Sequence, residues 1–205
     1  MKTSKLLLMA LFLMGFNTAF SQFKGVNLSM GGGLTLAKVN CSGYYSSPSE
    51  LTGRSSFGFF ADKKIKSGLF ARTGLFYNGL GEAYSYANQD MQDEFNYISL
   101  PLQVLHPVGN TPFSIYAGPQ VSYLLNASRK TEGNSIVMIT DEFRKVMVTG
   151  TAGVLCKLAP RFNVSFEYER SFYNSITKEF ADNLEKGSKY QPMGFAFRAY
   201  YRMSK

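Results

Sequence analysis

Two carboxylates stand two positions apart in the stretch "VSFEYERS", and their spacing would suit acid–base chemistry. Glu167 and Glu169 alternate with Phe166 and Tyr168. On an extended strand both carboxylates therefore point to the same face. Such a pair can act as general acid and general base. It can equally be structural, because a charge removed from water needs a partner of opposite sign.

Three arginines are candidate partners for these carboxylates. Arg198 and Arg202 share the polar face of the last alternating stretch, and Arg72 has a similar position in an earlier one. If the last two stretches are joined in register, Glu167 lies opposite or diagonal to Arg198. The sequence therefore favours a structural network over a catalytic site. Its expected members are Glu167, Glu169, Arg198, Arg202 and Arg72.

The other reactive side chains are His106, Cys41 and Cys156. His106 stands in a short turn before Pro107, where a general base would lack a neighbouring serine and acid, so we interpret it as a turn residue. The two cysteines are expected at opposite ends of their strands, beyond the Cα separation of about 4.4–6.8 Å that a disulfide permits. We expect two free thiols, no metal site and no cofactor.

The strands that carry these residues are predicted from the periodicity of apolar and polar residues in the sequence. Eight stretches alternate apolar and polar side chains, as strands do. The short connections are "KKIKSG", "HPVGNTP" and "APR", and the longer polar ones are Lys38 to Gly53, Gly81 to Asp93, Ala127 to Glu142 and Ser175 to Lys189. This alternation of short and long connections is typical of an up-and-down meander. The stretches cover 26–36, 57–62, 69–78, 98–104, 113–125, 146–158, 162–169 and 193–203.

The composition of the two strand faces indicates the fold class. The polar faces contain mainly Gly, Ser, Thr, Asn and Gln, which suit a crowded lumen better than a solvated surface. The apolar faces extend over roughly ten residues, as in a tilted membrane-spanning strand. Lipid requires every backbone group to be paired, so such strands must close into a barrel. We predict an all-β, eight-stranded antiparallel up-and-down transmembrane β-barrel, present as a monomer. The alternative is a soluble lipocalin-like barrel with its apolar face turned inward.

Aromatic residues near the strand ends are expected to mark the lipid–water boundaries, where such rings are favoured. The chain contains no tryptophan, so tyrosine and phenylalanine would form any such girdle. The candidates are Phe23, Tyr77, Tyr97, Tyr123, Phe162, Phe172, Tyr190 and Tyr201.

The N-terminus, "MKTSKLLLMALFLMGFNTAFSQ", has the features of a secretory signal peptide. Its apolar run is shorter than the roughly 20 residues that span a bilayer as a helix. We predict a signal peptide over 1–21 and an outer-membrane barrel domain over 22–205. The formal net charge is +8, and loss of Lys2 and Lys5 would leave +6. For an exported protein this favours phosphate-rich lipid over nucleic acid as the anionic neighbour; a mixed-sign solvated surface is the alternative.

Pro101 interrupts the strand-like stretch "YISLPLQVL", although proline donates no ladder hydrogen bond. A hairpin folded about Gly109 would place Pro101 near Gly118 and Pro119 near Leu100. We therefore expect a bulge or a water-filled gap in that ladder, with Gly118 permitting unusual backbone angles. Alternatively, each proline nitrogen lies at a bond that is already disrupted.

The stretch "NYISLPLQVL" followed by "PFSIYAGPQVSYLL" resembles the small outer-membrane β-barrel family of Bacteroidota, the porin-like and PorT-like barrels. In that family a Tyr-x-x-(apolar)-Pro-Leu strand precedes a hairpin into a Tyr-x-Gly-Pro strand. The resemblance implies the barrel fold and the outer membrane. Some members of that family assist protein secretion.

An eight-stranded barrel is just wide enough for its own side chains to fill it. We therefore expect a non-enzymatic scaffold that presents surface loops. Its expected partners are outer-membrane lipid, lipopolysaccharide and a secretion or envelope protein. A narrow channel for small solutes or ions is the alternative, and an outer-membrane lipid-modifying enzyme is a third.

Overall fold

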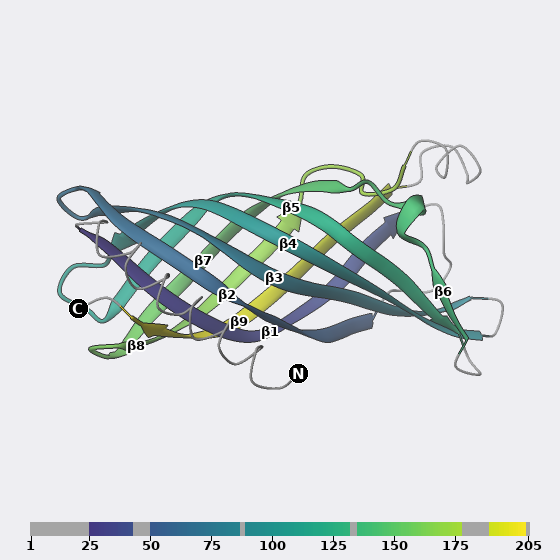
Figure 1. The fold of residues 1–205 in the computed structure, drawn as a ribbon, viewed down its shortest axis with the longest axis horizontal. Helices are drawn as coiled ribbons and strands as arrows, with labels where there is room; N and C mark the ends of the chain where they lie inside the picture. Colours follow the sequence, from purple (N-terminus) through teal and green to yellow (C-terminus); the bar gives the residue numbers. More distant parts are fainter. Residues whose placement is uncertain (1–24, 43–49, 87–88, 132–134, 178–188, 204–205) are drawn as a thin grey trace, which may run out of the picture.

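The computed structural model describes residues 25–42, 50–86, 89–131, 135–177 and 189–203 (Figure 1). The predicted signal peptide lies outside them. The strands are β1 (Val26–Ser42), β2 (Glu50–Lys66), β3 (Leu69–Tyr86), β4 (Gln89–Pro107), β5 (Phe113–Thr131), β6 (Ile136–Met138), β7 (Val146–Ala159), β8 (Phe162–Ser171) and β9 (Lys189–Arg202). A 3₁₀ turn, η1 (Thr140–Glu142), follows β6. No helix among these residues is long and apolar enough to cross a membrane.

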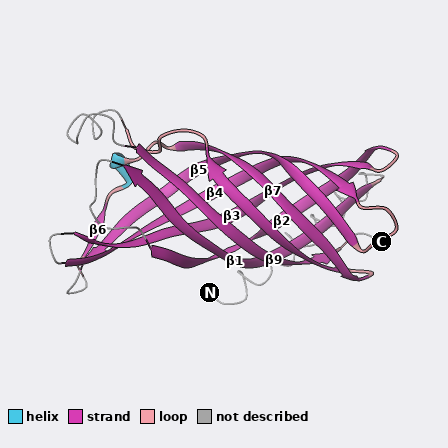
Figure 2. Cartoon of the chain, turned by 180° about the vertical axis from the view of Figure 1, so that it is seen from behind, coloured by secondary structure: helices cyan, strands magenta, loops and turns pink. Residues whose placement is uncertain are grey.

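Eight long antiparallel strands form one closed barrel, as predicted. The strand order is β4-β3-β2-β1-β9-β8-β7-β5, and pairing of β4 with β5 closes the ring. The three residues of β6 add to the outer end of β5. Both views show the same elongated cylinder of tilted strands (Figures 1 and 2). Near the ends of the chain, Ser29 of β1 pairs with Arg202 of β9, so the described chain starts and finishes at one rim.

The apolar faces of the strands point outward. A soluble lipocalin-like barrel would bury these side chains, so the arrangement contradicts that alternative and fits lipid as the surrounding solvent. The exposed apolar band has members on each of the eight long strands, including Leu34, Phe57, Leu75, Leu102, Ile115, Val154, Phe166 and Phe197.

The strands are longer than the alternation predicted. The segment Gly81 to Asp93, expected as a loop, is largely a hairpin in which Tyr86 pairs with Gln89. In β5 the outward side chains change from apolar to polar at Leu125 and Asn126. These two consecutive residues are both exposed, because the β4–β5 ladder shifts its register there. Beyond this point both faces are partly polar, so the alternation disappears although the backbone pairing continues.

The predicted register of the β4–β5 hairpin was wrong by two residues. The turn is closed by the hydrogen bond from Val108 N to Phe113 O (2.9 Å), so it is centred one residue after the position assumed. Pro101 consequently lies opposite Gln120. The two prolines, which have no backbone N–H to donate, also interrupt two different ladders and not one. Pairing of β3 with β4 is interrupted beside Pro101, and pairing of β4 with β5 is interrupted beside Pro119.

The predicted bulge at the prolines is also absent, because the register shift of β4 with β5 lies at Asn96 and Tyr97. Gly118 is not among the glycines with positive φ. Its role is close approach: a Cβ added there would lie 2.1 Å from the carbonyl oxygen of Leu102. The two strands therefore come together where the ladder lacks hydrogen bonds, and only a residue without a side chain fits.

The length of the connections predicts which rim faces the periplasm, because barrels of this class have short periplasmic turns. A protease site inserted at Asn110 should resist protease added to intact cells. A site inserted in the 132–134 connection, which joins β5 to β6, should be cut. Immunoblots before and after opening of the outer membrane measure this difference. The opposite cleavage pattern would show that the barrel has the opposite orientation in the membrane.

Candidate functional site: the filled lumen

The middle of the lumen holds a buried ion pair. Arg198 Nη1 lies 2.7 Å from Glu167 Oε1, and both side chains are buried. In the β8–β9 ladder Arg198 is opposite Ser165, so it meets Glu167 diagonally. Gln103 Nε2 donates to the second carboxylate oxygen of Glu167 over 3.0 Å, and Arg198 Nε donates to Ser56 Oγ over 3.2 Å. Strands β2, β4, β8 and β9 together position this pair.

Glu169 is held differently from Glu167. Its two oxygens accept longer bonds of 3.4 Å from Asn78 Nδ2 and Gln120 Nε2. Asn78 in turn accepts a hydrogen bond of 2.9 Å from Thr35 Oγ1. These donors are neutral amides on distant strands. The sequence did not indicate them, because polar side chains on β1, β3, β5 and β8 meet only when the barrel closes.

Arg72 belongs to a second ion pair, nearer the rim that carries the short β2–β3 turn. Its Nε and Nη2 donate to the two oxygens of Asp62 over 2.7 and 3.1 Å. Asp62 was absent from the predicted network, although it lies directly opposite Arg72 in the β2–β3 ladder. The short "KKIKSG" connection could have revealed it, because a tight hairpin sets the register of the strands it joins.

The inner part of the lumen is filled by an apolar cluster, here called the inner cluster. The guanidinium carbon of Arg72 lies 5.2 Å from the ring centre of Tyr116, and that of Arg198 lies 4.6 Å from the ring centre of Phe76. These distances are in the cation–π range, so the rings compensate part of the burial of the charges. The inner cluster consists of Phe60, Phe76, Leu105, Tyr116, Leu155 and Tyr200.

A second apolar group, the outer cluster, fills the lumen toward the rim with the longer connections. Its centre is a set of three rings, Phe95, Phe143 and Tyr190, with centroids 4.8–6.0 Å apart in edge-to-face contacts. The Tyr190 hydroxyl donates to Glu82. Tyr97 and Tyr190 were expected in the girdle, but both are buried in this cluster because they lie on inward positions of their strands. Phe143 enters from the segment after η1, which pairs with Ile176.

Charged groups lie beyond the outer cluster, where Asp93 and Arg129 pair two ladder positions past Phe95 and Ala127. Arg129 donates from Nε and Nη2 to the two oxygens of Asp93, both over 2.8 Å. Glu142 lies 3.9 Å from the same guanidinium. Partial burial raises the pKa of Glu142, while Arg129 acts in the opposite direction.

The remaining predicted site residues lie apart from the buried layer. Arg202 is at the inner end of β9, and the ion pairs of the described residues do not join it to Glu167 or Glu169. His106 is exposed, with its Nδ1 2.5 Å from the carbonyl oxygen of Gly68. Cys156 is a half-buried free thiol, and the side chain of Cys41 lies outside the described residues. Among the described residues, no His, Cys, Asp and Glu side chains gather as metal ligands.

The lumen is thus stacked in layers: an apolar cluster toward each end and a polar layer with an ion pair and hydrogen bonds between them. Glu167 and Glu169 are enclosed by these layers, an arrangement that suits a structural role. A closed antiparallel barrel, apolar outside and filled inside, defines a small transmembrane β-barrel.

The chain belongs to the outer membrane protein beta-barrel domain family, whose model matches residues 5–202. Its compartment is accordingly the outer membrane. No curated protein sequence matches the chain.

Two solved bacterial structures share this fold. Neisserial surface protein A is 14% identical, with a TM-score of 0.55 over 88% of this chain and 100% of that one. Ail, the attachment invasion locus protein of Yersinia pestis, is 15% identical, with a TM-score of 0.50 over 86% of this chain and 98% of that one. At these identities the likeness shows the fold alone.

Proposed function

We propose that the protein is a non-enzymatic scaffold of the outer membrane that presents its outer rim and surface loops to a partner. The filled lumen is the observation that carries this proposal. The outer cluster, the Glu167–Arg198 layer and the inner cluster follow one another along the barrel axis. A solute would have to displace buried side chains from all three layers. The outer rim is then the part of the molecule available for a specific interaction.

The outer rim has features suited to binding. The three residues of β6 are all exposed although apolar, and they lie beyond the point where β5 turns polar outside. Lipopolysaccharide and a secretion or envelope protein are the partner classes that we propose. The resemblance to PorT-like barrels supports a secretion-associated role. Ail, which shares the fold, is named the attachment invasion locus protein of Yersinia pestis.

The test of this proposal is conductance. The folded barrel, incorporated in planar bilayers, is expected to give no reproducible single-channel steps, because its apolar layers exclude hydrated ions. A wide outer-membrane porin in the same bilayers serves as the positive control. Regular steps whose ion selectivity changes on Arg198→Gln would instead support the narrow channel, since Arg198 would then line the path.

A further inference from the structure

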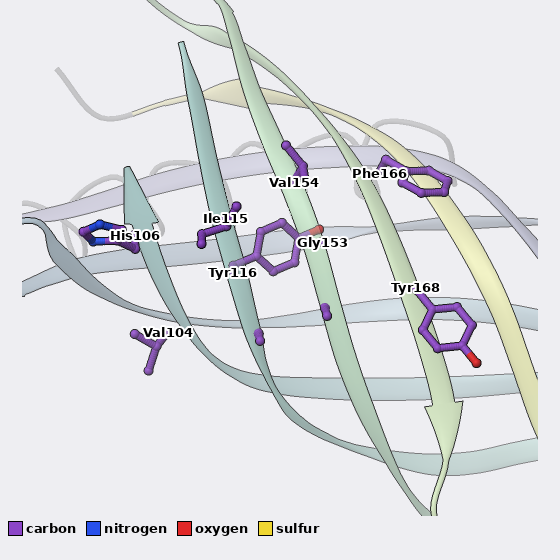
Figure 3. A pocket seen from close by; sticks show the side chains of 10 residues that line it. Val104, His106, Ile115, Tyr116, Gly153, Val154, Phe166 and Tyr168 are labelled. Atoms are coloured by element: carbon purple, nitrogen blue, oxygen red, sulfur yellow. The ribbon is translucent and has the colours of Figure 1, made fainter. Parts of the chain in front are cut away.

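The apolar side chains of the lipid-facing band belong to strands that are paired on both sides. Val104, Ile115, Val154 and Phe166 line a hollow in this surface (Figure 3), and each has a ladder partner on either side. Their backbone groups therefore need no further partner, and lipid chains are a sufficient contact for their side chains. Strand β6 is different, because it lies beyond the point where β5 turns polar outside and has a free edge.

β6 lies at the end of the sheet order and is paired on one side only. Its three residues pair with Ser128 to Lys130 of β5, and no described residue pairs with its other edge. β7 does not extend this far, since its first residue, Val146, lies opposite Tyr123. The side chain of Thr140 ends the pairing next to β6, because its hydroxyl bonds both the nitrogen (2.9 Å) and the carbonyl oxygen (3.2 Å) of Ala127.

The pairs that flank β6 show which of its backbone groups are bonded to β5. Thr131 N donates to Ser135 O over 3.1 Å, and Ile139 N donates to Ala127 O over 3.0 Å. In an antiparallel ladder, hydrogen-bonded pairs alternate with non-hydrogen-bonded ones. Val137 is two residues from each flanking pair, so its N–H and C=O also point toward β5.

Ile136 and Met138 are therefore the open positions of β6. Each directs its N–H and C=O away from β5, which leaves two donors and two acceptors along the free edge. Their side chains are 69% and 63% exposed. They point outward, because Val137 between them is opposite Arg129, which reaches inward to Asp93. β6 contains no lysine or proline, the residues that commonly protect an exposed edge.

The chemistry of this edge selects its occupant. Acyl chains of a lipid could cover the two apolar side chains, but they offer no hydrogen bonds to four backbone groups. A second copy of β6 could offer them, yet antiparallel strands are related by an axis perpendicular to their sheet. Because β6 continues the barrel wall, that axis would reverse the second barrel in the membrane. An extended segment of a different protein has neither restriction.

We propose that the free edge of β6 binds an extended segment of a partner protein by antiparallel strand addition. The segment places apolar side chains opposite Ile136 and Met138, and its backbone bonds the four open groups of these residues. This proposal rests on the scaffold function and adds to it the class of partner and the way in which the partner is held. Main-chain bonds supply the affinity, and the two exposed side chains supply the specificity.

A synthetic peptide that copies residues 135–139, "SIVMI", with flanking lysines for solubility, is the probe. In the antiparallel register centred on Val137, Ile136 of the barrel faces the methionine of the peptide and Met138 faces its isoleucine. Amide hydrogen exchange of the refolded barrel in micelles is followed by NMR. Without peptide, Val137 should be protected while Ile136 and Met138 exchange freely. With peptide, exchange of Ile136 and Met138 should slow severalfold.

N-methylation of the peptide separates strand addition from apolar adhesion. Methyl groups on the isoleucine and methionine nitrogens block the bonds to β6, so this peptide should give no protection. A methyl group on the valine nitrogen points away from β6, and that peptide should still protect. In the barrel, Met138→Pro removes one open N–H and should weaken binding severalfold at unchanged gel mobility. Met138→Leu keeps the N–H and should bind as the unsubstituted barrel does.

Equal effects of the two N-methylated peptides, or no protection by any peptide, would overturn the proposal. Slow exchange of Ile136 and Met138 in the barrel alone would overturn it too. If that exchange depended on barrel concentration, the occupant would be a second copy, and otherwise a segment of the same chain. Regular conductance steps would contradict the scaffold function and leave the peptide result intact. A silent barrel that binds no peptide would contradict strand addition alone.

Discussion

Glu167→Gln is expected to lower the free energy of unfolding by about 3–5 kcal/mol, because it leaves Arg198 charged and buried without its ion-pair partner. The carboxylate also accepts the amide of Gln103, and a glutamine there can accept through only one oxygen. Urea titration of the refolded barrel in detergent micelles or vesicles measures the loss. Water that enters the lumen of the variant would reduce it.

Adding Arg198→Gln to this variant should recover part of the lost stability, because the pair is then neutral on both sides. The double-mutant cycle isolates the coupling between the two groups. Glu169→Gln is the matched control: it changes the same residue type on the same face of β8, two positions away. Because Glu169 accepts two bonds of 3.4 Å from neutral amides, its loss should be clearly smaller.

Strictly additive effects of the Glu167 and Arg198 substitutions would show that the ion pair contributes no coupling. If Glu167→Gln instead removed an assayable activity and left the stability unchanged, Glu167 and Glu169 would be interpreted as catalytic carboxylates.

Gly33→Ala is expected to prevent closure of the barrel. A Cβ at this position would lie 1.8 Å from the carbonyl oxygen of Phe197 and 2.7 Å from the Cα of Arg198, and both are backbone atoms that cannot move aside. The strands concerned, β1 and β9, form the seam between the two ends of the chain. Mobility on unheated gels measures closure, because a closed barrel resists detergent and migrates faster than the unfolded chain.

The matched control for this prediction is Gly53→Ala on β2. A Cβ there would meet only the end of the Leu36 side chain, at 3.4 Å, which is ordinary contact. This variant should keep the fast mobility of the folded barrel. Fast mobility of the Gly33→Ala variant as well would mean that the seam tolerates a wider separation of β1 from β9.

The run of Gly31 to Gly33 illustrates how far local sequence reasoning reaches. Three consecutive glycines in a strand predict a bend or close packing, and they do not predict a phosphate-binding loop, because no helix follows them. The sequence contained no indication that the close neighbour would be β9, about 165 residues further along the chain. That contact arises only because the sheet closes on itself.

Contacts between side chains also divide into local ones, which the sequence can predict, and long-range ones, which it cannot. Asp62 and Arg72 face each other across a short hairpin, so their ion pair is a local consequence of the turn. Gln103 and Glu167 come from strands that are not neighbours in the sheet, and they meet across the lumen. The first pair was open to sequence reasoning and was missed, whereas the second depends on the diameter and tilt of the barrel.

The sequence by itself determined the strands, their inward and outward faces and the closed barrel, because a period of two is a local property and lipid admits no open sheet edge. It did not determine where the strands end, since polar side chains outside the lipid remove the alternation while β3 and β4 continue to pair as far as Tyr86 and Gln89. Only the tertiary structure decided which inward residues meet. Tyr97 and Tyr190 became part of the outer cluster and Gln103 the donor to Glu167 because contacts across the lumen depend on the register around the whole ring.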